Sequence, residues 1–131
     1  MILLDTHALI WLVAEPKRLS RAAARAIQRA RSADGLAIAD ITLWELAVLF
    51  QRGHLRAHGT TEASVRLVTE SAGASVKPIT PEIAALAAQF PEDYPHDPAD
   101  LLIGATARAE GLPLVTRDEG IRASKLVKTI W

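Results

Sequence analysis

Five acidic residues are the candidates for chemistry in this sequence. Asp5 and Asp118 each follow a short apolar run, and ligands of open α/β sheets bind outside the carboxyl ends of such strands. Asp97 and Asp100 lie three residues apart at what reads as the start of a helix, on one of its faces. Glu45 is unusual, because it lies inside a mostly apolar helical stretch. One crevice at the edge of a sheet can collect these side chains.

Carboxylates in one low-dielectric crevice repel one another, so at least one stays protonated unless a cation neutralises them. Oxygen ligands without His or Cys partners favour Mg²⁺ or Mn²⁺, and Mg²⁺ typically adds waters and substrate phosphate oxygens to one or two carboxylates. The matching reaction is phosphodiester hydrolysis, because a bound metal makes water a better nucleophile and stabilises charge on the phosphate.

Simpler explanations exist for the same residues. Asp97 precedes Pro98, a pair typical of a helix start in which the aspartate is only a cap. Asp5 and Asp118 stand where aspartates often form turns at strand ends. For Glu45, a structural role at the boundary of the core and a functional role in a site are equally good interpretations. The residues alone therefore leave the metal site as one of two hypotheses.

The elements that must position these acids alternate along the chain. Apolar runs predict short buried strands, and capping residues, prolines and glycines delimit helices between them. Thr6 and Thr42 are the expected caps of the first and third helices. This alternation predicts an α/β fold with a mostly parallel sheet covered on both faces. The expected strands are 1–5, 36–39, 75–79, 112–115 and 127–130; the expected helices are 6–15, 20–33, 42–53, 61–71, 81–90 and 98–110, with a turn at 117–120.

The composition limits the possible classes of protein. The 131 residues suit one domain, 1–131, with 15 basic and 15 acidic side chains and no cysteine. The lack of cysteine excludes disulfides and thiolate catalysis, and no apolar stretch is long enough to span a bilayer, so we expect a cytoplasmic protein. Zero net charge hides a basic segment, 17–31, and an acidic one, 92–100. The basic segment is either an RNA-binding face or an ordinary solvated one.

Other candidate sites are weaker. His54 and His58 have the spacing of two zinc ligands, but no glutamate follows His54. His7 and His96 are expected to be solvated or hydrogen-bonded rather than catalytic bases. Glycine-rich phosphate loops and serine-triad motifs are absent. The three tryptophans are expected in the core or at an interface rather than as platforms for stacking bases: Trp11, Trp44 and Trp131.

Four strings in order carry a family resemblance. They are LLDTHALIWL, ADITLWELAVLFQRGHL, HDPADLLIGATA and GLPLVTRDEGI, and VKTIW closes the chain. Together they resemble the PIN-domain family, and more closely its VapC-type ribonuclease toxins from bacterial toxin-antitoxin pairs. The resemblance implies a three-layer α/β/α sandwich and a metal-dependent endoribonuclease that uses Mg²⁺ or Mn²⁺. It also implies a homodimer and a cognate antitoxin that blocks the site.

The resemblance assigns roles to particular residues. It places four acids at the metal, and Thr6 and Thr116 at positions near the site that the family often fills with Thr or Ser. Between Asp97 and Asp100 we favour Asp100 as the ligand, with Asp97 as helix cap and outer support. The implied catalytic and metal-binding residues are Asp5, Glu45, Asp100 and Asp118.

The chain departs from the family pattern on the helix that carries Asp100. Relatives often have an aromatic residue, an arginine and an alanine where this chain has Ala99, Leu101 and Gly104. Loss of the arginine removes a cation beside the acids. Two rival functions follow, a catalytically weak PIN-like binding module and an aspartate-based phosphatase or phosphoryl receiver, for which Lys125 is the only candidate lysine.

Overall fold

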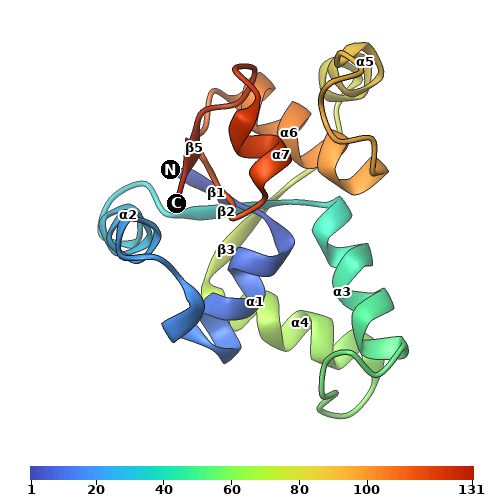
Figure 1. Ribbon diagram of the computed structural model, residues 1–131. Coiled ribbons are helices and arrows are strands. Elements are labelled where there is room, and N and C mark those ends of the chain that lie inside the picture. Colours follow the sequence, from blue (N-terminus) through green and yellow to red (C-terminus); the bar gives the residue numbers. More distant parts are fainter.

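Five parallel strands form one sheet in the computed structural model, which describes residues 1–131 (Figure 1). The strand order is β3-β2-β1-β4-β5. Leu4 of β1 pairs with Ile38 of β2 and Val115 of β4, so these three strands end at nearly the same level. The strand bounds are β1 (Ile2–Leu4), β2 (Leu36–Ala39), β3 (Ala74–Lys77), β4 (Leu114–Val115) and β5 (Thr129–Ile130).

Helices cover both faces of this sheet. Ile2 and Leu4 pack into a core with α1, α2 and α3, whereas Leu3 between them packs with α6 and α7 on the opposite face. This alternation of buried side chains is the expected pattern of a strand covered on both sides. The α/β/α sandwich is confirmed. The helices are α1 (Thr6–Ala14), α2 (Arg21–Arg31), α3 (Ile41–Gln51), α4 (Thr61–Ala72), α5 (Pro81–Gln89), α6 (Pro98–Glu110) and α7 (Glu119–Ala123), with one 3₁₀ turn, η1 (Pro16–Arg18).

Two expected helix caps are wrong. Asp5, not Thr6, caps α1, because its side chain accepts a hydrogen bond from the Ala8 amide. The helix α3 begins one residue before Thr42, after Asp40. Both threonines are instead buried inside their first turns, where their hydroxyls lie 3.1 Å apart and bond to each other. Threonine therefore links two helices here rather than opening either one.

The segment after β4 is more ordered than the expected turn at 117–120. Asp118 ends that segment's extended backbone and caps α7 by accepting a hydrogen bond from the Ile121 amide at 2.9 Å. A segment of five residues that includes a glycine is a weak helical signal. The hydrogen bond from the capping aspartate stabilises this short helix, which the sequence pattern alone does not predict. The helix α7 carries its own side chains to the same edge of the sheet as Asp5.

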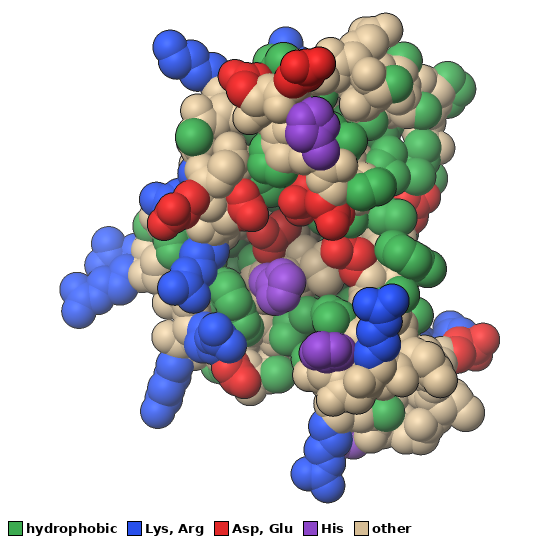
Figure 2. Space-filling view, turned by 45° about the vertical axis from the view of Figure 1, so that its right-hand side comes forward, with side chains coloured by type: hydrophobic (Ala, Val, Ile, Leu, Met, Phe, Trp, Pro, Cys, Tyr) green, Lys and Arg blue, Asp and Glu red, His purple; other side chains and the backbone are tan.

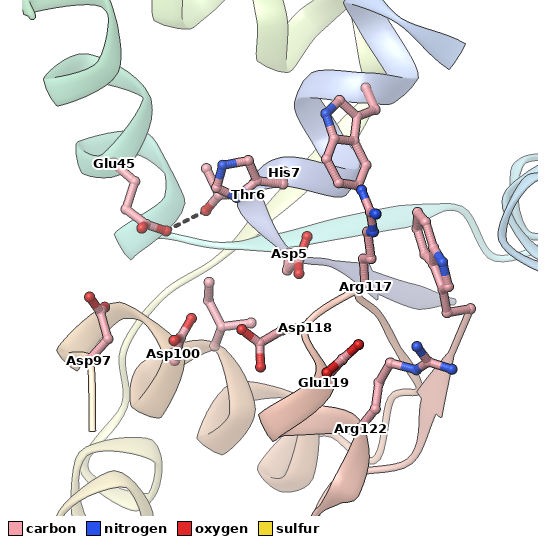
Figure 3. Close-up of a pocket in the computed structure, with 13 residues that line it drawn as sticks. Asp5, Thr6, His7, Glu45, Asp97, Asp100, Arg117, Asp118, Glu119 and Arg122 are labelled. Carbon is pink, nitrogen blue, oxygen red and sulfur yellow. Dashed lines mark hydrogen bonds between the residues drawn. The ribbon is translucent and has the colours of Figure 1, made fainter. Parts of the chain in front are cut away.

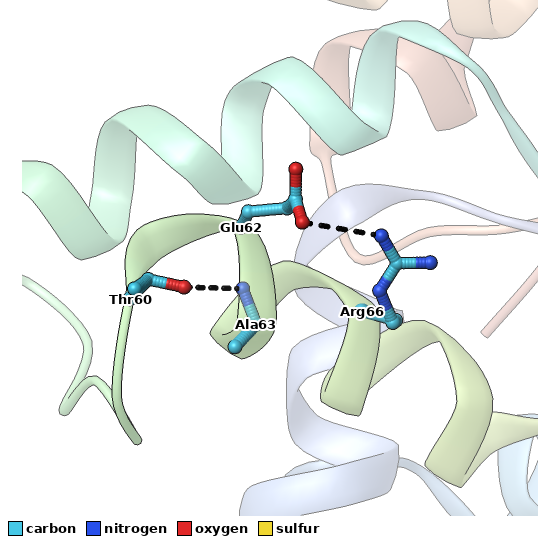
Figure 4. A network of polar contacts seen from close by, with 4 residues as sticks. All are labelled: Thr60, Glu62, Ala63 and Arg66. Carbon is cyan, nitrogen blue, oxygen red and sulfur yellow. Dashed lines mark hydrogen bonds and ion pairs between the residues drawn. The ribbon is translucent and has the colours of Figure 1, made fainter.

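The outer helices follow ordinary capping rules. In α4 the Thr60 hydroxyl accepts a hydrogen bond from the Ala63 amide, and Arg66 pairs with Glu62 at 3.3 Å (Figure 4). That ion pair is solvent-exposed and contributes little to stability. Ser20 and Asp97 cap α2 and α6 as expected. None of the helices combines the length and apolar character needed to cross a bilayer.

Candidate active site

A pocket of about 490 Å³ opens at the carboxyl ends of β1 and β4 (Figure 3). The space-filling view shows acidic side chains gathered in a hollow on this face, with Lys and Arg side chains along one side of it (Figure 2). The five acids singled out in the sequence all line the pocket, and Glu119 joins them. The lining residues are Asp5, Thr6, His7, Trp11, Glu45, Asp97, Asp100, Ile103, Arg117, Asp118, Glu119, Arg122 and Trp131.

Asp5 is held at the floor of the pocket by the helix that it caps. Its Oδ1 accepts a hydrogen bond from the Ala8 amide at 2.8 Å. Burial raises the pKa of Asp5, and the hydroxyl of Thr116 and the Ala8 amide partly oppose that shift. The carboxylate is therefore fixed in place while its charge is costly, which is the condition that a bound cation relieves.

Glu45 reaches the pocket from α3, across the pocket from Asp118 (Figure 3). The Thr6 hydroxyl donates a short hydrogen bond to Oε1 of Glu45, and the buried hydroxyl of Thr42 lies behind it at 3.1 Å. Burial, opposed by this hydrogen bond, raises the pKa of Glu45. Thr6, which the family resemblance implies near the site, thus bonds to a carboxylate of the pocket. A glutamate held this way has a fixed orientation toward the other acids.

Asp97, Asp100 and Asp118 complete the acidic wall and differ in what their oxygens do. Asp97 accepts from the Ala99 amide at 2.9 Å as the cap of α6, and Asp118 caps α7. The Thr116 hydroxyl in turn accepts from the Asp118 amide at 3.1 Å. No hydrogen bond within the protein engages the Asp100 carboxylate, which leaves both its oxygens for a ligand. This difference agrees with Asp97 as cap and favours Asp100 as ligand.

The acids repel one another most strongly at Asp100. Burial and then the charges of Asp97, Asp118, Glu45 and Asp5 raise the pKa of Asp100 to about 7. A carboxyl group with that pKa is only half ionised near neutral pH in the absence of a cation. Several carboxylates facing one pocket therefore create an excess of negative charge that the protein itself does not neutralise.

The donor set fits a hard divalent cation that brings its own waters. The side chains do not converge into a cage, because no group of three or more acidic or histidine side chains surrounds one point. Mg²⁺ commonly takes only one or two carboxylates and fills its other positions with water and phosphate oxygens. A pocket of this volume, walled by separate carboxylates, provides that arrangement.

A contact that sequence reasoning missed explains Gly104. The hydroxyl of Tyr94, a buried side chain, donates to the carbonyl oxygen of Asp100 at 3.0 Å. A Cβ at position 104 would overlap this hydroxyl and lie 2.8 Å from the ring carbon that bears it. The glycine thus makes room for a tyrosine that braces the turn carrying Asp100. Nothing in the local pattern links positions ten residues apart across a proline-rich loop.

Leu101 does not face the acids. It packs among apolar side chains between α5 and α6 and is not part of the pocket wall. The pocket receives its positive charge from Arg117 and Arg122 instead, on the segment that includes α7. The spacing of four between Asp118 and Arg122 was the available sequence signal for this, because it puts both on one face of a helical turn.

Several residues stay outside the pocket. Asp40 also follows a strand, but its Oδ2 accepts a hydrogen bond from the Ile79 amide at 2.9 Å, away from the other acids. His54 and His58 are exposed and line no common site with the acids, and the His96 ring lies 2.8 Å from the Glu92 carbonyl. The lysine proposed for a phosphoryl receiver, Lys125, is likewise absent from the pocket wall.

Comparison with known proteins gives consistent matches over nearly the whole chain. The PIN domain family model matches residues 2–125. Ribonuclease VapC22 of Mycobacterium tuberculosis is 39% identical over 132 residues, which cover 99% of this chain and 98% of that protein. Among solved structures, FitAcB from Neisseria gonorrhoeae is 26% identical, with a TM-score of 0.63 and coverage of 98% of this chain and 96% of the other.

A second solved structure shows the likeness of fold alone. VapBC2 from Rickettsia felis, bound to a DNA fragment from its promoter, is 15% identical with a TM-score of 0.73. The match covers 98% of this chain and 97% of the other. The α/β/α arrangement around the pocket is therefore shared with structures whose sequences have diverged widely.

Proposed function

The chain belongs to the PIN-domain family, among its VapC-type ribonucleases, and we propose that it is a metal-dependent endoribonuclease that acts as the toxin of a toxin-antitoxin pair. The observation that carries the proposal is the cluster of mutually repelling carboxylates in one open pocket, where the pKa of Asp100 is raised to about 7. Its substrate is RNA and its proposed place of action is the cytoplasm.

Four acids would hold one or two Mg²⁺ or Mn²⁺ ions: Asp5, Glu45, Asp100 and Asp118. When bound, such an ion supplies an activated water for attack at phosphorus and stabilises negative charge on the phosphate and the leaving oxygen. The protein's own contribution is orientation. The Ala8 amide fixes Asp5, the Thr6 hydroxyl fixes Glu45, and the α7 cap fixes Asp118.

The antitoxin partner is supported by an apolar groove that has the helix α1 in common with the acidic pocket. The similar solved structures include toxin-antitoxin complexes by name, among them one from Klebsiella pneumoniae that is 25% identical, with a TM-score of 0.65. In this chain a groove of about 330 Å³ lies between α1, α3 and α4, lined by Ile10, Val13, Phe50, Leu67 and other side chains. Because α1 also carries Thr6 and Trp11 into the acidic pocket, one peptide segment along α1 can fill the groove and cover the site.

A homodimer is supported by apolar side chains left in solvent. Trp44 on α3 is 63% exposed, and Val76 and Ile79 at the edge strand β3 are exposed as well. Exposed aromatic side chains and unpaired strand edges are features that proteins usually cover. We propose that a second copy of the chain does so here.

One assay tests the catalytic proposal. The purified chain, free of antitoxin, is incubated with a structured RNA in Mg²⁺, Mn²⁺ or EDTA beside the variants Asp5→Asn and Asp40→Asn. We expect metal-dependent cleavage that Asp5→Asn loses and Asp40→Asn keeps, because Asp5 lines the pocket and Asp40 does not. Cleavage that Asp5→Asn retains in full would contradict the acidic pocket as the site of catalysis, and no cleavage with either metal would leave a binding module as the better description.

A further inference from the structure

The acidic pocket has a second end of opposite character. Arg117 and Arg122 lie across Asp118 and Glu119 from the side that carries Glu45, Asp97 and Asp100 (Figure 3). Two tryptophans line this end as well, Trp11 and Trp131. One continuous cavity thus joins a wall of carboxylates to a patch of guanidinium and indole groups, which we call the Arg–Trp end.

The two guanidinium groups at this end are not consumed by ion pairs. The four ion pairs of the structure involve neither Arg117 nor Arg122, although Asp118 directly follows Arg117 and Glu119 lies three residues before Arg122. The guanidinium carbon of Arg117 lies 5.9 Å from the centroid of the Trp11 ring, and Arg18 lies over the same ring at 4.7 Å. Contact with the indole orients Arg117 and leaves its N–H donors without a carboxylate partner.

The tryptophans divide between support and exposure. Trp11 is buried, with its ring 5.8 Å from that of His7 and 5.7 Å from that of Trp131. Trp131 is only partly buried and borders the pocket. Trp11 therefore supports the patch as a buried side chain. Trp131 can present part of its indole surface to a ligand in the cavity. The sequence predicts Trp131 in the core or at an interface rather than as a platform for stacking bases, so a base on this surface would correct that prediction.

We propose that the Arg–Trp end is the binding site for the RNA nucleotide next to the scissile phosphate, with its phosphate on Arg117 and Arg122 and its base against Trp131. The proposal rests on the ribonuclease function inferred above. Arginine beside an exposed aromatic ring is the combination that holds single-stranded nucleic acid, because one takes the phosphate and the other the face of a base. Binding and cleavage then occupy opposite ends of one pocket.

The alternative occupant is an acidic segment of a protein partner. An acidic peptide would pair with the same arginines, but its carboxylates would gain nothing from the indole of Trp131 or from the neighbouring acidic cluster. The two occupants differ in a measurable way, since only RNA offers a base to Trp131. An RNA that lacks one base separates the aromatic contribution from the electrostatic one.

The test measures binding without cleavage. All proteins carry Asp5→Asn so that the RNA stays intact, and fluorescence anisotropy follows a short fluorescein-labelled single-stranded RNA over a range of salt concentrations. The variants are Arg122→Ala, Trp131→Ala and, as a matched control, Arg66→Ala on α4, which lines a different pocket (Figure 4). Arg122 is exposed, so its replacement leaves the fold intact.

We expect Arg122→Ala to weaken RNA binding and to lower the slope of log Kd against log salt by about 0.7, the value for one phosphate contact on a single strand. Trp131→Ala should weaken binding of intact RNA by roughly 5- to 100-fold, and binding of an RNA with abasic sites far less. Arg66→Ala should match the parent. Thermal melting checks that Trp131→Ala is folded, and Trp131→Phe should retain most of the affinity.

Cleavage kinetics in the otherwise wild-type chain give the second readout. Arg122→Ala should raise KM and leave kcat within a few-fold, because it acts on a neighbouring nucleotide. The inference is overturned if Arg122→Ala and Trp131→Ala bind RNA as Arg66→Ala does, or if they lose affinity only for the antitoxin. A wild type that binds RNA through this end but never cleaves it would instead overturn the proposed catalytic function.

Discussion

The two ends of the pocket carry opposite charges and suit ligands of opposite charge. At the acidic end four elements, β1, α3, α6 and the segment before α7, bring carboxylates together, and burial together with the neighbouring charges raises the pKa of Asp100 to about 7. At the Arg–Trp end two guanidinium groups stay free of ion pairs, and the one of Arg117 lies 5.9 Å from the centroid of the Trp11 ring. The acidic end has charge that only a cation relieves, and the other end has charge that suits a phosphate.

The comparison teaches that a chain can be neutral as a whole and still contain a strongly polarised, acidic pocket. The chain as a whole has zero net charge, which at first argues against a nucleic-acid partner. A metal at the acidic end would offset part of the carboxylate charge there, so that a phosphate at the Arg–Trp end would meet less repulsion. Net charge therefore says little about binding when part of the acid content is reserved for a metal.

The largest effect should come from the acidic end itself. Replacing Asp100 by Asn should lower kcat for RNA cleavage by more than about 100-fold, because even residues that only support metal ligands are worth 10- to 100-fold. Asp97→Asn should lower kcat by about 10-fold or less and change stability little, because Asn caps a helix about as well as Asp does. Steady-state kinetics on both variants check this; the reverse order would make Asp97 the ligand.

The next effect tests how the acids are held. Thr6→Val removes the hydroxyl that bonds to Glu45 and keeps the shape of the side chain. The kcat for RNA cleavage should therefore fall by roughly 10-fold while KM for RNA stays near the wild-type value. Thr69→Val, on α4 outside the acidic pocket, is the matched control. If KM rather than kcat changes in Thr6→Val, the hydroxyl serves the substrate and not Glu45.

A smaller effect concerns the brace behind Asp100. Gly104→Ala should lower the free energy of unfolding by about 1–3 kcal/mol, because the new methyl group collides with the Tyr94 ring and its hydroxyl. Urea unfolding measures the change. Tyr94→Phe combined with Gly104→Ala should cost less than the sum of the two single changes, since the hydroxyl is then absent. Strict additivity would show that the two residues do not contact.

The smallest effect is a pH dependence confined to the acidic end. In EDTA the folded protein binds more protons than the unfolded chain between pH 3.8 and about 7, because the pKa of Asp100 is raised in the fold. Stability should therefore fall as pH rises through this window. Mn²⁺ should restore a few degrees of melting temperature at pH 8 and little at pH 5.

Asp100→Asn is the matched variant for this pH experiment. Because the amide does not titrate, the variant should show a shallower fall in melting temperature with pH, and the remaining slope comes from Asp5 and Glu45. An unchanged slope in Asp100→Asn would mean that another group titrates in this window. Differential scanning fluorimetry in EDTA and in Mn²⁺ provides both curves.

The sequence predicted the strands, the outer helices and the five acids well, because each leaves a local signal. Asp5 ends an apolar run, and Asp97 precedes a proline that starts a helix. Strand periodicity places such residues at one edge of a parallel sheet without further information. The fold class and the acidic end of the pocket follow from these signals together with the family resemblance.

What the sequence missed depends on contacts between distant residues. Thr6 and Thr42 read as caps, since the pattern does not show that they meet across 36 residues. Gly104 read as a departure, since the tyrosine that needs the space lies ten residues earlier. Arg117 belonged to the expected turn at 117–120 and Arg122 to no expected element, and the short helix α7 carries Arg122 to the pocket.

The central claim is that the acidic end cleaves RNA with the help of a divalent metal. The most direct measurement is the single-turnover cleavage rate at saturating RNA as a function of Mn²⁺ concentration, for the wild type and Asp5→Asn. We predict a wild-type rate that rises with Mn²⁺ to a plateau, is abolished by EDTA, and is lost in Asp5→Asn at every Mn²⁺ concentration. A rate that is independent of Mn²⁺, or that Asp5→Asn retains, would contradict it.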